Sequence, residues 1–119
     1  MIETVSGWEL VVDRGPNWLF VKVRGPKGDS WDASRLAERV WALLEEHFAD
    51  HLILELDELG VLSSSFLGQL LLLRKRIALH GGLMRLCGLS SRAQEVLHCC
   101  RLDTQFSCYR NREEAVMGC

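Results

Sequence analysis

Short apolar runs alternate along the chain with longer stretches in which apolar residues recur at helical spacing. Five runs have the length and the residue types of strands: Trp8–Asp13, Trp18–Val23, Leu52–Leu56, Leu83–Cys87 and Phe106–Tyr109. The first two flank the turn residues Arg14-Gly15-Pro16-Asn17 and are predicted to form a hairpin. The third run is predicted to lie at the centre of the sheet.

Two longer stretches predict helices on either side of this central strand. The first helix is expected to begin near Asp32 or Ala33, with Asp32 as its N-cap. The second is expected over Gln69–Leu79 and contains four consecutive leucines, so we expect it to be covered on more than one side. Gly81-Gly82 is predicted to end it, because glycine tolerates the left-handed conformation found at helix ends.

Two further helices complete the predicted order of elements. Ser90 or Ser91 is expected to cap the third helix, and Asn111 with Glu114 forms a capping-box pattern that opens a short fourth one. The order is then β-β-α-β-α-β-α-β-α. It predicts a single α/β domain over residues 1–119, with about four helices on a mixed, mostly parallel sheet of about five strands.

Composition is that of one globular domain. The chain has 119 residues, of which 48% are hydrophobic and 25% charged. Its net charge of −2 argues against general nucleic-acid binding, which requires a basic face. The one dense basic cluster, Arg74-Lys75-Arg76, is interpreted as the solvated side of a helix, with a docking patch for an acidic partner as the alternative.

Nothing in the sequence resembles a targeting or membrane-spanning segment. The start, Met1–Thr4, has no basic residue and no apolar run behind it. No apolar stretch approaches the roughly 20 residues that a membrane helix needs. We therefore expect no membrane insertion and a cytoplasmic location.

The sequence offers no enzyme or cofactor motif. It lacks a nucleophile elbow, a phosphate-binding glycine loop and a zinc-protease motif. Its five cysteines are odd in number and form no CxxC pair (Cys87, Cys99, Cys100, Cys108 and Cys119), so no disulfide framework or zinc site is expected. His47 and His51 are four residues apart but lack a third ligand nearby. Next to His98, Cys99 and Cys100 are expected to form a buried helix end. No catalytic residue, metal or cofactor is predicted.

The serine triplet Ser63-Ser64-Ser65 is the most informative feature. It follows the central strand and immediately precedes a helix. One serine is enough to cap the free N–H groups of a helix, yet three occur. A phosphate there would face the positive end of the helix macrodipole and would change the surface charge without unfolding the helix. The carboxylates Asp57 and Glu58 end the strand before it and are interpreted as a polar loop, with a functional role as the alternative.

Two stretches resemble STAS domains, the family of bacterial anti-sigma-factor antagonists. In residues 54–68 a hydrophobic strand and an acidic turn lead to Ser63-Ser64-Ser65-Phe66-Leu67-Gly68, which is similar to the family pattern Asp-Ser-Ser-Gly-Leu-Gly. Residues 81–90 resemble the family's Gly-Gly, strand and serine-capped helix. The end of the chain agrees as well, through Leu102, Phe106 and Glu113-Glu114-Ala115.

This resemblance implies a compact α/β domain that binds a partner kinase of the anti-sigma type. The phosphorylated serine would be Ser64, and its phosphate would release the partner by placing charge in a desolvated interface. Two positions depart from the family: Ser63 replaces its aspartate and Phe66 replaces its glycine. Ser63 is therefore a second candidate acceptor, and unmodified docking is an alternative. Phe66 is either a docking anchor or a core residue.

The predicted docking surface comprises Ser63, Ser64, Ser65, Phe66, Asp57 and Glu58. The favoured function is a regulatory domain that docks to an anti-sigma factor or switch kinase. The alternative, also implied by resemblance, is an accessory subunit that binds the ATPase of a lipid-transport ABC system without phosphorylation. A redox or metal enzyme built on the cysteines is a third, less favoured hypothesis.

Overall fold

The structure, a computed structural model, describes residues 2–5, 7–25, 34–59 and 62–118. Within these ranges one six-stranded sheet is formed, and its strands lie side by side in chain order. They are β1 (Ile2–Val5), β2 (Trp8–Arg14), β3 (Leu19–Arg24), β4 (His51–Glu55), β5 (Leu83–Cys87) and β6 (Ser107–Tyr109). Strands β1 to β3 pair antiparallel, whereas β3 to β6 pair parallel.

The predicted class, hairpin and order of elements are confirmed, and β1 is one strand more than the pattern indicated. It lies at the edge of the sheet and pairs with β2 through a reversal at Gly7, whose φ is +87°. Four residues are too few to show the alternation that marks a strand in the sequence. The strand forms because β2 offers it an unpaired edge.

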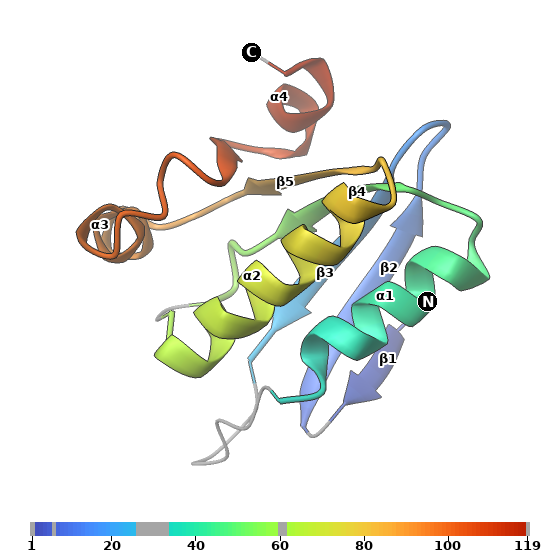
Figure 1. Ribbon diagram of the computed structural model, residues 1–119, viewed down its shortest axis with the longest axis horizontal. Coiled ribbons are helices and arrows are strands. Elements are labelled where there is room, and N and C mark those ends of the chain that lie inside the picture. Colours follow the sequence, from blue (N-terminus) through green and yellow to red (C-terminus); the bar gives the residue numbers. More distant parts are fainter. Residues whose placement is uncertain (1, 6, 26–33, 60–61, 119) are drawn as a thin grey trace.

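Among the described residues, four helices accompany the sheet: α1 (Leu36–Glu46), α2 (Ser64–Leu79), α3 (Ser91–Cys99) and α4 (Arg112–Met117). Figure 1 shows α1 and α2 side by side over one face of the sheet, with α3 at the side of the molecule beyond β5. Helix α4 covers part of the other face, where Ala115 packs with Phe20, Ile53 and Cys87. No helix in the described ranges is long and apolar enough to span a membrane.

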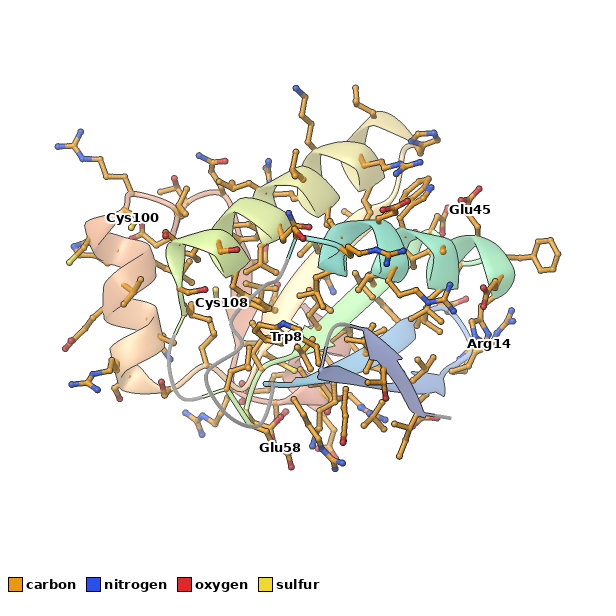
Figure 2. The ribbon with its side chains drawn as sticks, turned by 90° about the horizontal axis from the view of Figure 1, so that it is seen from below. Trp8, Arg14, Glu45, Glu58, Cys100 and Cys108 are labelled. Carbon is orange, nitrogen blue, oxygen red and sulfur yellow. The ribbon has the colours of Figure 1, made fainter. Side chains whose placement is uncertain are left out.

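Strand β4 is buried on both faces. Leu52 and Leu54 belong to the main core under α1 and α2, whereas Ile53 belongs to the smaller core under α4. In the main core Trp8 of β2 stacks on Phe66 of α2 with ring centroids 5.4 Å apart, and Figure 2 shows Trp8 in the interior. Because β3 and β5 flank this strand, its predicted central position is confirmed.

Helix α2 begins earlier than its predicted start at Gln69, because the side chain of Ser63 caps it. It rests on the sheet and against α1, as expected for a helix with a run of leucines. Its outer surface nevertheless stays open. Leu70 and Leu73 are buried, whereas Leu72 is 58% exposed.

The predicted end of α2 at two glycines is confirmed. Gly81 has a φ of +76°, and the N–H of Gly82 donates to the carbonyl of Ile77 at 2.9 Å. A Cβ on Gly82 would lie 2.1 Å from the carbonyl oxygen of Asp50, so the second glycine is required by close packing. Any larger residue here would push the α2–β5 connection away from the start of β4.

The predicted starts of α1 and α4 can be compared with the structure in turn. Helix α1 begins at Leu36 in the described residues, while the predicted start at Asp32 or Ala33 lies outside them. At α4 the predicted cap is confirmed, since the Asn111 side chain accepts a hydrogen bond from the N–H of Glu114 at 2.9 Å.

Arg112 fastens α4 to the face of the sheet that α1 and α2 leave open. Its guanidinium pairs with Glu55 of β4 and, at 2.7 Å, with Asp13 of β2. It also lies 4.2 Å above the ring of Phe20 on β3. Glu55 is only 8% exposed, and Lys22 is its second cationic neighbour at 3.8 Å. A buried carboxylate needs such partners, so one arginine joins three strands and the terminal helix.

We expect Arg112→Met to lower the free energy of unfolding by about 2 kcal/mol, because Glu55 then stays buried with only Lys22 nearby. Asp13→Asn is the matched control. It removes the exposed partner of the same guanidinium, so its effect should be much smaller. Urea denaturation followed by circular dichroism at pH 7 measures both. Equal losses in the two variants would contradict the role given to Glu55.

Candidate docking site at the carboxyl edge of the sheet

The carboxyl ends of β4 and β5 lie next to each other, because the two strands are parallel neighbours. The chain leaves β4 through Leu56–Leu59 toward α2, and leaves β5 through Gly88–Ser90 toward α3. Loops that bind ligands or partners gather at this edge in α/β sheets. Gly60 and Val61, in the first connection, lie outside the described residues.

The two connections touch at Gly88. Its φ is +76°, and a Cβ there would lie 2.8 Å from the Cβ of Asp57. Both facts require glycine at this position. The N–H of Leu56 also donates to the carbonyl of Cys87 at 2.9 Å, which carries the pairing of the strands one residue further. The sequence shows Gly88 only as a loop residue, since its close neighbour is 31 positions earlier in the chain.

The serine triplet divides into one cap and two exposed positions. Ser63 is the N-cap of α2, and its Oγ accepts a hydrogen bond from the N–H of Phe66 at 3.1 Å. Ser64 and Ser65 are exposed residues of the first turn, rather than preceding the helix as predicted. Ser64 therefore lies on the surface where a strand connection becomes a helix.

Phe66 lies inside the molecule. It is 1% exposed and stacks on Trp8 with an interplanar angle of 17°. The structure thus favours the core alternative over the predicted docking anchor, because a side chain with almost no exposed surface cannot contact a partner in this conformation. The apolar ring instead holds the first turn of α2 against β2, which fixes the direction in which Ser64 and Ser65 are displayed.

Asp57 and Glu58 are exposed and already paired. Asp57 accepts a hydrogen bond from the ammonium group of Lys22 at 3.3 Å, and Glu58 pairs with the guanidinium of Arg24. Glu9 lies 3.6 Å from the same guanidinium. The acidic turn therefore joins the ends of β2 and β3 at this edge. It contributes a surface of mixed sign rather than a cluster of unpaired carboxylates.

The N-termini of α2 and α3 both open at this edge, and neither has an acidic residue in its first turn. Ser90, the first of the two predicted candidates, caps α3 by accepting from the N–H of Ala93 at 3.1 Å. By contrast, α4 begins with Glu113 and Glu114. The positive ends of α2 and α3 are thus left without an acidic side chain in the first turn, which favours an anion placed beside them.

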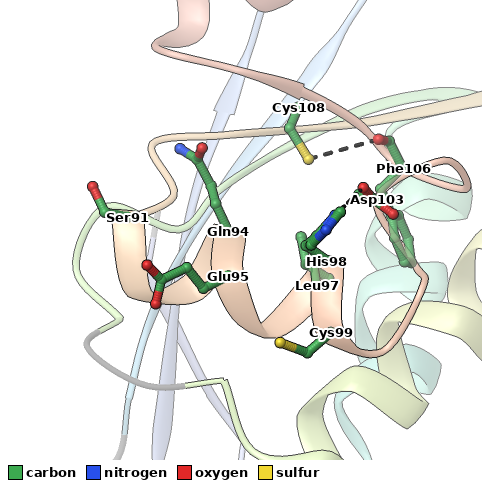
Figure 3. Close-up of a pocket in the computed structure, with 9 residues that line it drawn as sticks. All are labelled: Ser91, Gln94, Glu95, Leu97, His98, Cys99, Asp103, Phe106 and Cys108. Carbon is green, nitrogen blue, oxygen red and sulfur yellow. Dashed lines mark hydrogen bonds and ion pairs between the residues drawn. The ribbon is translucent and has the colours of Figure 1, made fainter.

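Figure 3 shows a separate cavity of about 710 Å³ beside α3. Its lining includes His98 and Asp103, whose Nδ1 and Oδ2 atoms are 2.9 Å apart. The hydrogen bond and charge of Asp103 raise the pKa of His98, and the imidazole in turn lowers the pKa of Asp103. Across the described part of the chain no group of His, Cys, Asp or Glu is arranged to hold a metal ion.

The four described cysteines are free thiols. Cys99 and Cys100 are exposed, so the expectation of a buried helix end was wrong. Figure 2 places Cys100 at the outer side of the molecule, because α3 packs on the core mainly through Ala93 and Leu97. Cys87 is buried, and desolvation raises its pKa to about 12. The fifth cysteine, Cys119, lies outside the described residues.

His47 and His51 lie at the opposite end of the sheet from the serines. His51 is held by Asp50, with Nδ1 and Oδ1 2.6 Å apart, and its ring meets the edge of Trp18 with centroids 5.1 Å apart. His47 is the C-cap residue of α1. The two side chains have separate neighbours and form no common site.

The STAS domain model matches residues 9–115, so the chain belongs to the STAS domain family. A solved structure of similar fold is an anti-sigma factor antagonist from Mycobacterium paratuberculosis, with 17% identity and a TM-score of 0.77 over 97% of this chain and 96% of that one. An anti-sigma-factor antagonist domain protein from Planctomyces limnophilus is 20% identical, with a TM-score of 0.77 over 92% and 96%.

The anti-sigma factor antagonist SpoIIAA in its unphosphorylated form is also similar, at 14% identity and a TM-score of 0.70 over 92% of this chain and 97% of that one. At these identities the likeness shows the fold. No curated protein matches the chain at a significant level.

We expect Ser63→Ala to lower the free energy of unfolding by about 1 kcal/mol, because it removes the side-chain acceptor at the start of α2. Ser64→Ala should change it by only a few tenths of a kcal/mol, since Ser64 is exposed and alanine suits a helix. Thermal and urea denaturation of the two variants check this. An equal effect of both substitutions would contradict the assignment of Ser63 as the cap.

The thiols are expected to react in an order set by their exposure and by their pKa. A short pulse of N-ethylmaleimide at pH 7.5, followed by peptide mass spectrometry, should modify Cys99 and Cys100 first. Cys108 is exposed as well, but desolvation raises its pKa and its thiol donates to the carbonyl of Phe106, so it should follow more slowly. Cys87 should react only when the protein is unfolded. Early modification of Cys87 in the native protein would contradict its placement under α4.

Proposed function

We propose that this chain is a regulatory domain that acts by binding a protein partner, an anti-sigma factor or serine kinase of the anti-sigma type, and that phosphorylation of Ser64 controls the binding. The observation that carries the proposal is the exposed hydroxyl of Ser64 in the first turn of α2, at a helix end with no acidic residue in its first turn. A kinase can reach this hydroxyl without unfolding the domain.

Ser64 suits the role of acceptor better than Ser63 does. The Oγ of Ser63 already accepts a hydrogen bond from the N–H of Phe66, and Ser63 is half-buried. Phosphorylation of Ser63 would have to displace a cap worth about 1 kcal/mol. Ser65 is exposed too, but the position that corresponds to the phosphorylated serine of the family is Ser64.

A phosphate on Ser64 would change the charge of the docking surface more than its shape. It adds roughly −1.5 to −2 charges at pH 7 beside backbone N–H groups that favour an anion. Asp57 and Glu58 are already paired with Lys22 and Arg24, so the phosphate would add negative charge that neither of these cations is free to match. A bound partner would then have to bury an unmatched charge, and the complex would dissociate.

The structural comparisons support this proposal through the fold. The similar structures include SpoIIAA in an unphosphorylated and in a phosphorylated form, the latter with a TM-score of 0.65 and 14% identity. The domain would act in the cytoplasm, without catalysing a reaction and without a cofactor. The predicted docking surface then consists of Ser63–Ser65 with Asp57 and Glu58, while Phe66 supports it from inside.

The alternative is an accessory subunit that binds the ATPase of an ABC transport system without phosphorylation. One observation favours it: a neutral serine, Ser63, caps α2 where the family pattern has aspartate, so the site is complete without a charge. The two functions differ in whether Ser64 is ever modified and in the class of protein that binds.

The test is affinity purification of the tagged full chain from its native cells, with mass spectrometry of partners and of residues 62–69. We expect phosphate on Ser64, and an anti-sigma factor or switch kinase bound to the wild type and to Ser64→Ala. Ser64→Glu should retain at least about tenfold less partner, and Ser65→Glu should serve as the matched control.

Two results would contradict the proposal. An ABC transporter ATPase bound equally by wild type and Ser64→Glu, with unmodified serines, would establish the alternative instead. Phosphate found on Ser63 and not on Ser64 would refute the assignment of the acceptor.

A further inference from the structure

The outer face of α1 and α2 carries an apolar stripe that the fold leaves uncovered. Leu72 and Leu79 are 58% and 76% exposed. They are seven residues apart on α2, so they lie on the same side of the helix two turns apart. A groove of about 440 Å³ runs beside them between the two helices, with Ala37 of α1 on its other wall. Exposed leucines next to a groove indicate a contact surface.

The charges on this face differ in sign between the two helices. On α1, Glu38 and Glu45 are exposed, seven residues apart and therefore on one side. On α2, Lys75 and Arg76 are exposed beside the leucine stripe. Figure 2 shows Glu45 projecting outward from α1. The face thus has an acidic half on α1 and a basic half on α2, where Lys75 and Arg76 lie between the two exposed leucines on the same side of the helix.

Within the basic half, Arg76 is held in place by an aromatic neighbour. The guanidinium of Arg76 lies 4.6 Å from the ring centre of Trp41 on α1. The ring of His80 lies against the same indole at 4.7 Å. In the described ranges, neither Lys75 nor Arg76 is in an ion pair with a carboxylate. Both cations are therefore available to a carboxylate from outside.

The two helices run in the same direction, because each connects neighbouring parallel strands. They are aligned by a hydrogen bond from the N–H of Ala37 to the side chain of Gln69 at 3.0 Å, and by Arg76 over Trp41. A two-fold axis parallel to both helices would place α1 of one copy over α2 of the other. The acidic half of each copy then faces the basic half of the other, so the same contact forms twice across the two-fold axis.

We propose that this face binds a second copy of the chain. Leu72 and Leu79 of each copy enter the groove between α1 and α2 of the other. Glu38 and Glu45 face the partner's Lys75 and Arg76, and the reverse contact completes the isologous interface. Two leucines and a few exposed ion pairs give a modest contact, so the dimer forms with a dissociation constant of roughly 1–100 µM.

A second copy fits this face better than other occupants. An anionic lipid surface would attract the basic half but repel Glu38 and Glu45 beside it. An unrelated acidic protein would match only half of the charges. The surface is also distinct from the serines, because Ser64 begins α2 and Leu79 ends it, about 22 Å away along the helix axis. Dimerisation therefore leaves the proposed phosphorylation site accessible.

Sedimentation velocity of the full chain between about 1 and 300 µM tests the proposal, since this range brackets the expected dissociation constant. The wild type should shift from monomer to dimer across this range. Leu72→Glu should weaken the dimer at least about tenfold. Lys75→Glu/Arg76→Glu and Glu38→Lys/Glu45→Lys should each do the same, because like charges then face one another. Arg92→Glu/Arg110→Glu is the matched control, with the same charge change away from the interface.

The decisive experiment mixes the two charge-reversed variants in equal amounts. In one variant both helices are acidic on this face, and in the other both are basic, so neither variant should dimerise with itself. In the mixed pair an acidic helix faces a basic helix at both contacts, so a heterodimer should form. Circular dichroism verifies that every variant is folded. A wild type that stays monomeric at 300 µM would overturn the proposal. Phe48 is 93% exposed and does not line the groove. A dimer that Phe48→Glu abolishes and Leu72→Glu does not would therefore also overturn the proposal, as would charge variants that fail to associate on mixing.

Discussion

The whole arrangement depends on burying both faces of one strand. Strand β4 places Leu52 and Leu54 under α1 and α2, and Ile53 and Glu55 under α4. A strand in which a glutamate follows three buried apolar residues can be buried in this way only if its charge is matched. Arg112 supplies the match and binds β2 as well. The sheet therefore depends on the terminal helix α4, because the guanidinium of Arg112 pairs with the buried carboxylate of Glu55.

The same strand also sets where the proposed docking edge lies. Because β4 and β5 are parallel neighbours, the helices that follow them begin side by side, each capped by a serine and free of acidic residues in its first turn. The buried ring of Phe66 stacks on Trp8 and anchors the first turn of α2, while Ser64 stays outside. The first turn of α2 therefore combines a buried ring that holds the helix in place with an exposed hydroxyl that can be modified, and a modification switch requires both. The charge can change while the helix remains in place.

Helix α2 connects two surfaces of different character. Its first turn presents serines at the carboxyl edge, and its last two turns present leucines and cations beside the acidic side of α1. The buried apolar residues of this helix all belong to the main core: Phe66, Leu67, Leu70, Leu73 and Ile77. Its outer side is therefore free for contacts with other molecules, and the two proposed contacts lie at opposite ends of one rigid element.

Local sequence determined the strands, the helix caps and the family. The strand runs, Ser63 before an apolar helix and Gly81-Gly82 after it depend on contacts within a few residues, so their patterns are visible in the chain itself. Tertiary structure alone decided that Phe66 is core, that Cys99 and Cys100 are exposed, and that β1 joins the edge of the sheet. It also decided the pairing of Glu55 with Arg112, 57 positions apart. These features depend on which distant surfaces meet, and periodicity along a chain carries no record of that.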